Sequence, residues 1–248
     1  PLVDGLVEYL QTNDIKTFGP SSAAAQLEGS KKFSKDFFIK YGVPTATYAA
    51  FDNFDSAKEL QDKGVLSNCH VNVVQLIDTV AHTNYQEELK YLVTNKDRID
   101  YIGKLLNTIS QSGNTLILVD RISAGEMLAE LIPDSSFVKG DVKLKDRKEA
   151  YDEINEGTNH VVIATYGVAS VGINIPRIFN LVLIEPGKSF VRVIQSIGRG
   201  VRKAKDKDFV QIWDLTSTCK FAKRHLTQRK KFYKEAEYPF TIEKVDWN

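Results

Sequence analysis

Five short segments with apolar stretches between residues 115 and 214 constrain the fold more than any other feature of the chain. Segments with the apolar spacing of helices lie between them, near residues 123–132, 145–156 and 189–203. Strands that are apolar on both faces and alternate with helices are typical of a parallel sheet covered on both sides. The sequence therefore predicts an α/β fold, with strands at "TLILVD" (115–120), "SFVKG" (136–140), "HVVIAT" (160–165), "NLVLIE" (180–185) and "FVQIWD" (209–214).

Polar loops follow three of these expected strands. Parallel sheets bind ligands at the carboxyl ends of their strands, so a site is expected where these loops meet. The loops begin with Asp120 and Arg121, with Thr165 and Tyr166, and with Glu185, which leads into "PGK".

The stretch "VIQSIGRGVRK", residues 193–203, places two arginines on one face of an expected helix. Gln195, Gly198, Arg199 and Arg202 stand at offsets of zero, three, four and seven, which share a face. Glycine inside a helix costs about 1 kcal/mol relative to alanine, so something is expected to approach closely at Gly198. Two guanidiniums and an amide suit a polyphosphate or a carboxylate cluster. The alternative is a surface helix with two scattered arginines.

Composition is that of an ordinary globular protein with one local bias. The 248 residues carry a net charge of +1 and are 42% hydrophobic, so no overall field marks a nucleic-acid binder. Residues 192–234 nevertheless hold thirteen lysines and arginines against three acidic residues. This block is either a solvated surface or, over the expected helix 219–236, a surface that follows nucleic-acid phosphates.

The cysteines and histidines form no pattern with metal-ligand spacing. The chain has two cysteines, Cys69 and Cys219, and four scattered histidines. No apolar run is long enough to span a bilayer. We therefore expect no metal site, no membrane partner, and free thiols in a reducing, cytoplasmic compartment.

The pattern of residues along the sequence changes at Val65, and this change predicts one segment over 1–64 and a second over 65–248. The first segment is expected to form a small, incomplete α/β unit of three helices and two strands. Its strands are expected at "IKTFG" and "TATYAAF", and one long helix at "SSAAAQLEGSKKFSKDFFIKYG". Because so few helices and strands bury little apolar surface, we expect this segment to pack loosely.

The later motifs resemble those of a known family. "ATYGVASVGINI" followed by "QSIGRGVRK" resembles motifs V and VI of superfamily 2 helicases, and "TLILVDRI" stands where motif IV belongs. Residues 68–246 are similar to the C-terminal half of the T-even-phage type of helicase, which remodels recombination and replication forks. The resemblance implies a RecA-like domain that acts in an ATP-dependent DNA helicase.

The resemblance also implies roles for single residues. Arg199 and Arg202 would reach ATP bound to a partner domain, with Arg202 as the arginine finger, and Gln195 would support the same site. Gly172 and Asn174 would lie near the ribose and the interdomain cleft. Many family members have aspartate where this chain has Asn174, and an amide still forms hydrogen bonds but carries no charge.

For the nucleic acid, the resemblance implies that Arg121, Thr165 and Tyr166 lie near the backbone of branched or single-stranded DNA. The motor half of such a helicase needs a P-loop, GxxxxGK[ST]. The one GKS, at Gly187, has Val182 rather than glycine five positions earlier, and no DExx box follows a strand. We therefore expect no useful ATP hydrolysis by this chain alone. ATP and Mg²⁺ are expected only with a P-loop-bearing motor domain acting in trans.

The first segment resembles a different family. "GPSSAAAQLEGSKKFSKDF" is similar to phosphoribosylamine–glycine ligase, the ATP-grasp enzyme of purine synthesis, and the resemblance covers about 1–64. It implies that Lys31 contacts ATP; the alternative is a solvated helix lysine. The grasp sheets and metal-binding acids are not in the sequence. The chain could be a natural fusion, a gene-calling or assembly error, or an exchange with a host gene. Its alternative functions are a ligase fragment and a non-catalytic remnant.

Overall fold

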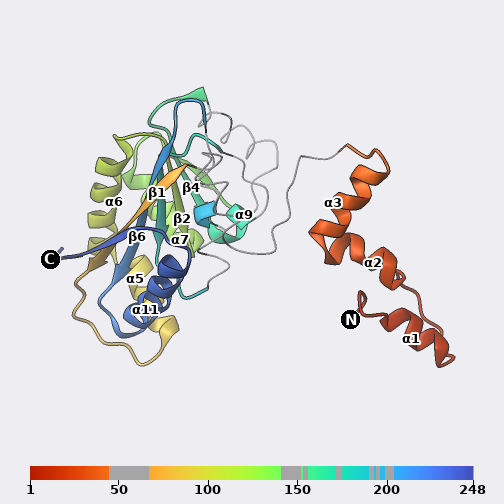
Figure 1. Ribbon diagram of the computed structural model, residues 1–248. Coiled ribbons are helices and arrows are strands. Elements are labelled where there is room, and N and C mark those ends of the chain that lie inside the picture. Colours follow the sequence, from red (N-terminus) through yellow and green to blue (C-terminus); the bar gives the residue numbers. More distant parts are fainter. Residues whose placement is uncertain are drawn as a thin grey trace. The chain divides into compact units, whose positions relative to one another are not determined.

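The computed structural model describes residues 1–44, 67–140, 152, 156–170, 175–189, 193, 196–198 and 204–247. The chain divides into two compact units, Pro1–Lys58 and Glu59–Asn248, drawn in Figure 1. The predicted boundary between the two segments, near Gly64, lies outside the described residues, as do the expected strand at "TATYAAF" and the helix after it.

The first unit has three helices in its described part: α1 (Leu6–Thr12), α2 (Ser22–Gly29) and α3 (Lys31–Lys40). The prediction of one long helix is wrong, because Ser30 is extended (φ −136°, ψ 110°) and separates α2 from α3. Its hydroxyl accepts a hydrogen bond from the backbone N–H of Phe33 at 3.2 Å, which starts α3. The strand predicted at "IKTFG" is also absent, since residues 15–19 have no strand conformation.

Little of the first unit is buried. Among the hydrophobic residues in 1–44, only Val7 and Ala25 are fully buried, while Tyr9, Phe18 and Ile39 are exposed. So small a core gives these helices little stabilisation from burial.

The second unit is built on one seven-stranded sheet in the order β3-β4-β2-β5-β6-β1-β7, with every pair parallel. This confirms the predicted parallel α/β sheet. A strand that sequence reasoning missed, β7, pairs with β1 at the edge. The strands are β1 (Asn68–Leu76), β2 (Thr115–Val119), β3 (Ser136–Val138), β4 (Val161–Thr165), β5 (Asn180–Ile184), β6 (Phe209–Ser217) and β7 (Phe240–Val245).

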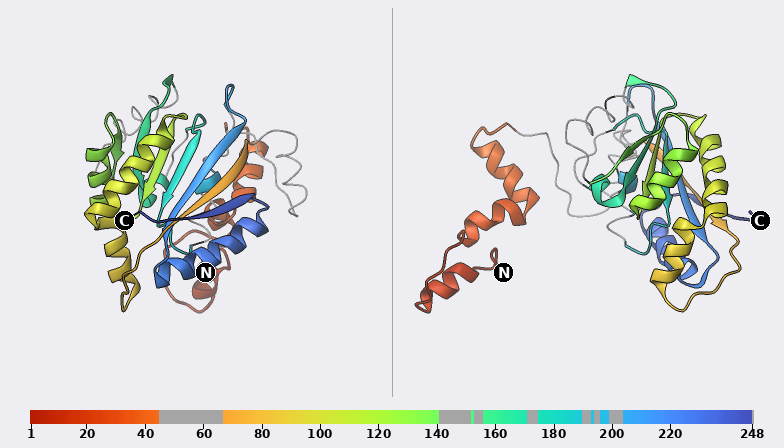
Figure 2. Two further views of the ribbon diagram at one scale, coloured as in Figure 1. Left: turned by 90° about the vertical axis from the view of Figure 1, so that its left-hand side faces the viewer. Right: turned by 180° about the vertical axis from the view of Figure 1, so that it is seen from behind.

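Helices cover both faces of the sheet (Figures 1 and 2). Consecutive strand residues point to opposite faces, so Leu116 and Leu118 join one core while Ile117 and Val119 join the other. The first core lies under α9 and α11, and the second under α5, α6 and α7. These helices are α5 (Tyr85–Thr94), α6 (Lys96–Ser110), α7 (Ile122–Leu131), α9 (Tyr166–Ser170) and α11 (Lys220–Glu235).

Helix α11 is attached to α5 through a buried carboxylate. Glu88 of α5 accepts hydrogen bonds from the backbone N–H groups of Phe221 (3.1 Å) and Ala222 (2.7 Å), at the start of α11. A carboxylate there satisfies free N–H groups and complements the helix dipole. The two helices therefore lie together at one end of the sheet, as Figure 1 shows. Of the described helices, not one is long and apolar enough to cross a membrane.

Candidate functional site

Two of the expected nucleic-acid residues lie at neighbouring strand ends. Strands β2 and β4 pair in parallel, with Val119 opposite Thr165. Arg121 follows β2 by two residues and is the first residue before α7, in extended conformation. Its Nη2 lies 3.4 Å from Gln86 Oε1, next to the start of α5. The sheet therefore brings Arg121 and Thr165 to one edge.

The ring of Tyr166, also expected near nucleic acid, lies inside the protein. Tyr166 is 6% exposed, and its hydroxyl donates to the carbonyl of Ile184 at 3.4 Å. The ring packs in the core under α9, so the expectation that this side chain contacts a nucleic acid needs correction. Thr165 is only partly buried, and its Oγ1 lies 3.4 Å from the N–H of Val168.

The residues expected at the nucleotide, Gly172, Asn174, Gln195, Arg199 and Arg202, lie outside the described residues. Their surroundings are partly described. Val193 and Ile197 are helical, and both side chains are fully buried in the core under α9 and α11. Gly198 is exposed, and a Cβ built on it would meet no atom of the described structure within 4 Å. Within the described residues, nothing fills the space over Gly198.

A buried ionic cluster that the sequence did not reveal lies at the same carboxyl edge. Arg98 of α6 is fully buried and donates to Asp78 Oδ2 (3.3 Å), to Glu185 Oε1 (2.9 Å) and to the carbonyl of Leu92. Thr216 Oγ1 donates to Glu185 Oε2 at 3.2 Å. The cluster joins the ends of β1, β5 and β6 to α6.

Burial raises the pKa of the Glu185 carboxyl to about 7, although Arg98 and Arg229 oppose the rise. Glu185 also has a left-handed backbone (φ 43°), which is uncommon for a residue other than glycine. The hydrogen bonds that Arg98 and Thr216 donate to the Glu185 carboxylate therefore hold its backbone in this unfavourable conformation directly after β5.

A second buried pair lies beside the first. Arg229 of α11 binds Asp214 through two hydrogen bonds of 2.8 Å, and Tyr233 donates to the same carboxylate at 2.8 Å. Arg229 also donates to the carbonyl of Gly187 at 2.7 Å. Its guanidinium thus fixes the loop after β5, in which Gly187 has a positive φ of 73°. In the sequence, this loop leads into the stretch "QSIGRGVRK".

One signal could have revealed these arginines. In α6, Arg98 stands four residues before Ile102, on the apolar stripe of the helix. In α11, Arg229 stands three residues after Leu226 and four before Tyr233, again among buried positions. A cation on an apolar stripe indicates a buried partner, because an unpaired buried charge is too costly.

A surface cavity of about 730 Å³ lies beside the loop after β5. It is lined by the start of α5 (Tyr85), by the loop itself, and by one side of α11. The rejected P-loop candidate, the GKS from Gly187, forms part of this wall in a turn. Two cations, Lys188 and Arg224, line the cavity together with the rings of Tyr85, Phe221 and His225.

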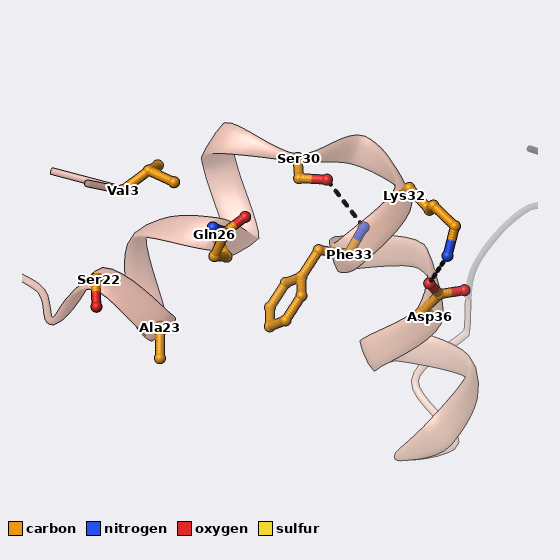
Figure 3. A pocket seen from close by; sticks show the side chains of 8 residues that line it. All are labelled: Val3, Ser22, Ala23, Gln26, Ser30, Lys32, Phe33 and Asp36. Carbon is orange, nitrogen blue, oxygen red and sulfur yellow. Dashed lines mark hydrogen bonds and ion pairs between the residues drawn. The ribbon is translucent and has the colours of Figure 1, made fainter. Parts of the chain in front are cut away.

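The first unit has a separate, shallow pocket of about 560 Å³, shown in Figure 3. Lys32 and Asp36 line it and form an exposed ion pair of 2.7 Å. Lys31, the expected ATP contact, begins α3 and is exposed, but it is not among the residues that line the pocket. Across the described parts of both units, no group of His, Cys, Asp and Glu side chains could hold a metal ion.

Residues 97–204 match the family model for the helicase conserved C-terminal domain. The matched stretch runs from α6 through β2, β4 and β5, and it includes the strand ends with Arg121 and Thr165. Together with the parallel sheet, this match shows that the second unit has a RecA-like fold and is similar to the C-terminal domain of helicases.

Among curated proteins, the chain is similar to the ATP-dependent DNA helicase uvsW of Enterobacteria phage T4. The two are 29% identical over 153 residues, which are 60% of this chain and 30% of that protein. The crystal structure of T4 UvsW matches with a TM-score of 0.64 at 23% identity, over 74% of this chain and 42% of that one. The fold is therefore shared.

The chain is also similar to the phosphoribosylamine–glycine ligase of Rhizobium meliloti, with 57% identity over 58 residues. These residues are 23% of this chain and 14% of the ligase. The chain spans less than half the length of each of these relatives.

Proposed function

We propose that the second unit is the second RecA-like domain of an ATP-dependent DNA helicase, and that it completes an ATP site whose other wall is a P-loop motor domain. One observation carries the proposal. The loop after β5, held by Arg98 through Glu185 and by Arg229 through Gly187, leads directly into "QSIGRGVRK" at the ligand-binding edge of the sheet.

In this proposal Arg199 and Arg202 stabilise the charge on the transferred γ-phosphoryl group, with Arg202 as the arginine finger. Such a guanidinium increases the rate of phosphoryl transfer by a factor of about 10³–10⁵. Gln195 supports the same site, and Gly172 and Asn174 lie near the ribose. The open space over Gly198 supports this arrangement, because a partner surface can approach the helix closely there.

The DNA would follow the strand ends at β2 and β4. Arg121 and Thr165 lie at neighbouring ends, and an arginine and a hydroxyl are common contacts for phosphate oxygens. The described part of the second unit offers Arg121 no carboxylate, only the amide oxygen of Gln86. Its positive charge is therefore available for a phosphate. The similarity to a phage DNA helicase favours DNA, branched or single-stranded, as the substrate.

A P-loop does not occur in these 248 residues, so the proposed ATP site needs a surface that they do not contain. We propose that a P-loop-bearing motor domain supplies it in trans, together with the bound ATP and Mg²⁺. The two free, buried cysteines suit a reducing compartment, and we propose the cytoplasm.

The test is complementation in trans. A motor domain of the same family, carrying a P-loop, is mixed with the full chain, and DNA-dependent ATP hydrolysis is measured. Addition of the chain should raise the rate, and Arg202→Ala should abolish the gain. Lys203→Ala removes a neighbouring positive charge and serves as the matched control, which should keep the gain. A gain that is insensitive to Arg202, or no gain, would refute the arginine-finger assignment.

A second candidate function rests on the 57% identity to a ligase. In it the first unit would contribute Lys31 to an ATP site, as part of purine biosynthesis. The exposure of Lys31 outside the pocket favours a solvated lysine instead. The assay is ATP consumption that depends on glycine and phosphoribosylamine, and we expect none. ATP consumption under these conditions that is lost in Lys31→Ala would reverse this judgement.

A further inference from the structure

The cavity beside the loop after β5 has a lining that the proposed ATP site does not use. Its described walls come from three places far apart in the sequence: Tyr85 at the start of α5, Pro186 to Ser189 after β5, and the first half of α11. It lies at the same carboxyl edge as Arg121 but beside β5 and α11 instead of β2 and β4.

Two cations from different elements line this cavity. Lys188 comes from the loop and Arg224 from α11, and both are exposed. Within the described ranges, no carboxylate forms an ion pair with either of them. The nearby acid, Glu88, is 1% exposed and already accepts two backbone hydrogen bonds at the start of α11. The net charge that an incoming ligand meets is therefore positive.

Aromatic rings line the cavity between these cations. The rings of Tyr85 and His225 meet edge to face, with centroids 4.8 Å apart, and Phe221 lies 6.3 Å from Tyr85. The guanidinium carbon of Arg224 is 6.0 Å from the Phe221 centroid. Burial lowers the pKa of His225, and Arg229 and Lys188 act in the same direction, so the imidazole is mostly uncharged at neutral pH. The Tyr85 and Phe221 rings are inclined by 60°, so a planar base can stack on one ring and touch the edge of the other, while Lys188 and Arg224 offer positive charge to its phosphate.

The cavity and Arg121 are joined at the first turn of α5. Tyr85 lines the cavity, and the next residue, Gln86, contacts the guanidinium of Arg121 at 3.4 Å. The first turn of α5 thus contributes both to the cavity and to the surroundings of Arg121.

From this arrangement we propose that the cavity is a subsite for one nucleotide of a single DNA strand, with the base against Tyr85 and Phe221 and the phosphate between Lys188 and Arg224. The proposal rests on the proposed function, because it extends the DNA path beyond Arg121. A single strand is required, since a base inside a duplex is stacked on both sides and has no free face to lay on a ring.

The test uses the full chain and a dye-labelled oligothymidylate, with binding followed by fluorescence anisotropy over a series of salt concentrations. Arg224→Gln should weaken binding and reduce the slope of log K against log salt by about 0.7, the share of one single-strand phosphate. Phe221→Ala should weaken binding on the order of tenfold through lost stacking. The matched control is Lys223→Gln, which removes one positive charge from the neighbouring position of α11 outside the cavity.

The outcomes separate this inference from the function on which it rests. If Arg121→Gln weakens binding while Arg224→Gln behaves like Lys223→Gln, the subsite is refuted and the helicase proposal stands. If the unchanged chain does not bind oligothymidylate at low salt, the DNA path fails as a whole. Displacement of the oligonucleotide by thymidine monophosphate or ATP at equal phosphate concentration would also refute the strand assignment, because it indicates a site for free nucleotides.

Discussion

Removal of the buried cation Arg229 should destabilise the second unit strongly. Arg229→Met keeps most of the side-chain volume but deletes two hydrogen bonds to Asp214 and one to the carbonyl of Gly187. Asp214 and Arg229 are both fully buried, so the carboxylate left behind cannot reach water. Breaking one side of a buried pair costs about 3–5 kcal/mol. Three separate charged hydrogen bonds would sum to about 4.5–9 kcal/mol, but they share one guanidinium and are not additive.

The assay is urea unfolding followed by tryptophan fluorescence. Trp213 lies in β6, next to Asp214, and its indole N–H is 3.3 Å from Asn180 Oδ1, so its emission should report on the sheet. The free energy of unfolding should fall by about 3–5 kcal/mol in Arg229→Met. Lys231→Met, on the exposed side of the same helix, should change it by less than about 0.5 kcal/mol.

A double variant makes the test sharper. Asp214→Leu combined with Arg229→Met removes both charges, so it should be more stable than Arg229→Met alone. A loss for Arg229→Met no larger than that for Lys231→Met would show that the pair does not hold the loop after β5. A double variant as unstable as the sum of the two single variants would show that the charges are not coupled.

Three further predictions follow from single residues. The pKa of Glu185 is about 7 in the folded protein, raised from 4.5, so the folded protein holds this proton more tightly than the unfolded chain does. The protonated carboxyl therefore contributes stability at low pH, and this contribution is lost as the pH rises from about 4.5 to about 7. The unfolding free energy of the unchanged chain relative to Glu185→Gln, measured in urea, should therefore decline across that window, and a flat difference would contradict the assignment. Gly198→Ala should raise the free energy of unfolding by about 1 kcal/mol, because the added Cβ meets no atom of the described residues. The same variant should reduce ATPase activity in the trans assay, and unchanged activity would show that no partner surface approaches Gly198. Burial raises the pKa of the Cys69 thiol to about 11, so this thiol should react with a disulfide reagent at neutral pH only after urea is added, and rapid labelling of the native chain at this residue would contradict its burial.

The sheet could be predicted where burial leaves a direct pattern in the sequence. Strands β2 and β5 are buried along their whole length, and both read as continuous apolar runs. Strand β7 was missed because "FTIEKV" is mostly exposed, and only its pairing with β1 makes it a strand. The break between α2 and α3 was missed because Ser30 offers the backbone a hydrogen bond that competes with a continuous helix.

The position of the candidate site at the carboxyl edge of the sheet could be predicted, but the buried arginines and their ion pairs beside it could not. Parallel pairing brings Arg121 and Thr165 to one edge without further information. The buried arginines were missed because a charged side chain in a helix is usually solvated, and their acidic partners lie many residues away in the sequence. The ring of Tyr166 was misjudged because the sequence does not reveal on which side of the sheet it packs.

The last strand has a consequence for the rest of the sheet. β7 pairs with β1 on one side only, and it presents Glu243 and Lys244 to water. Its neighbour β1 is nine residues long and mostly apolar, and it would become the outermost strand if the chain stopped before Phe240. An uncovered strand of that length invites pairing with another molecule, whereas a charged one discourages it. In the described sheet, β7 therefore covers an edge that would otherwise be open to pairing with another molecule.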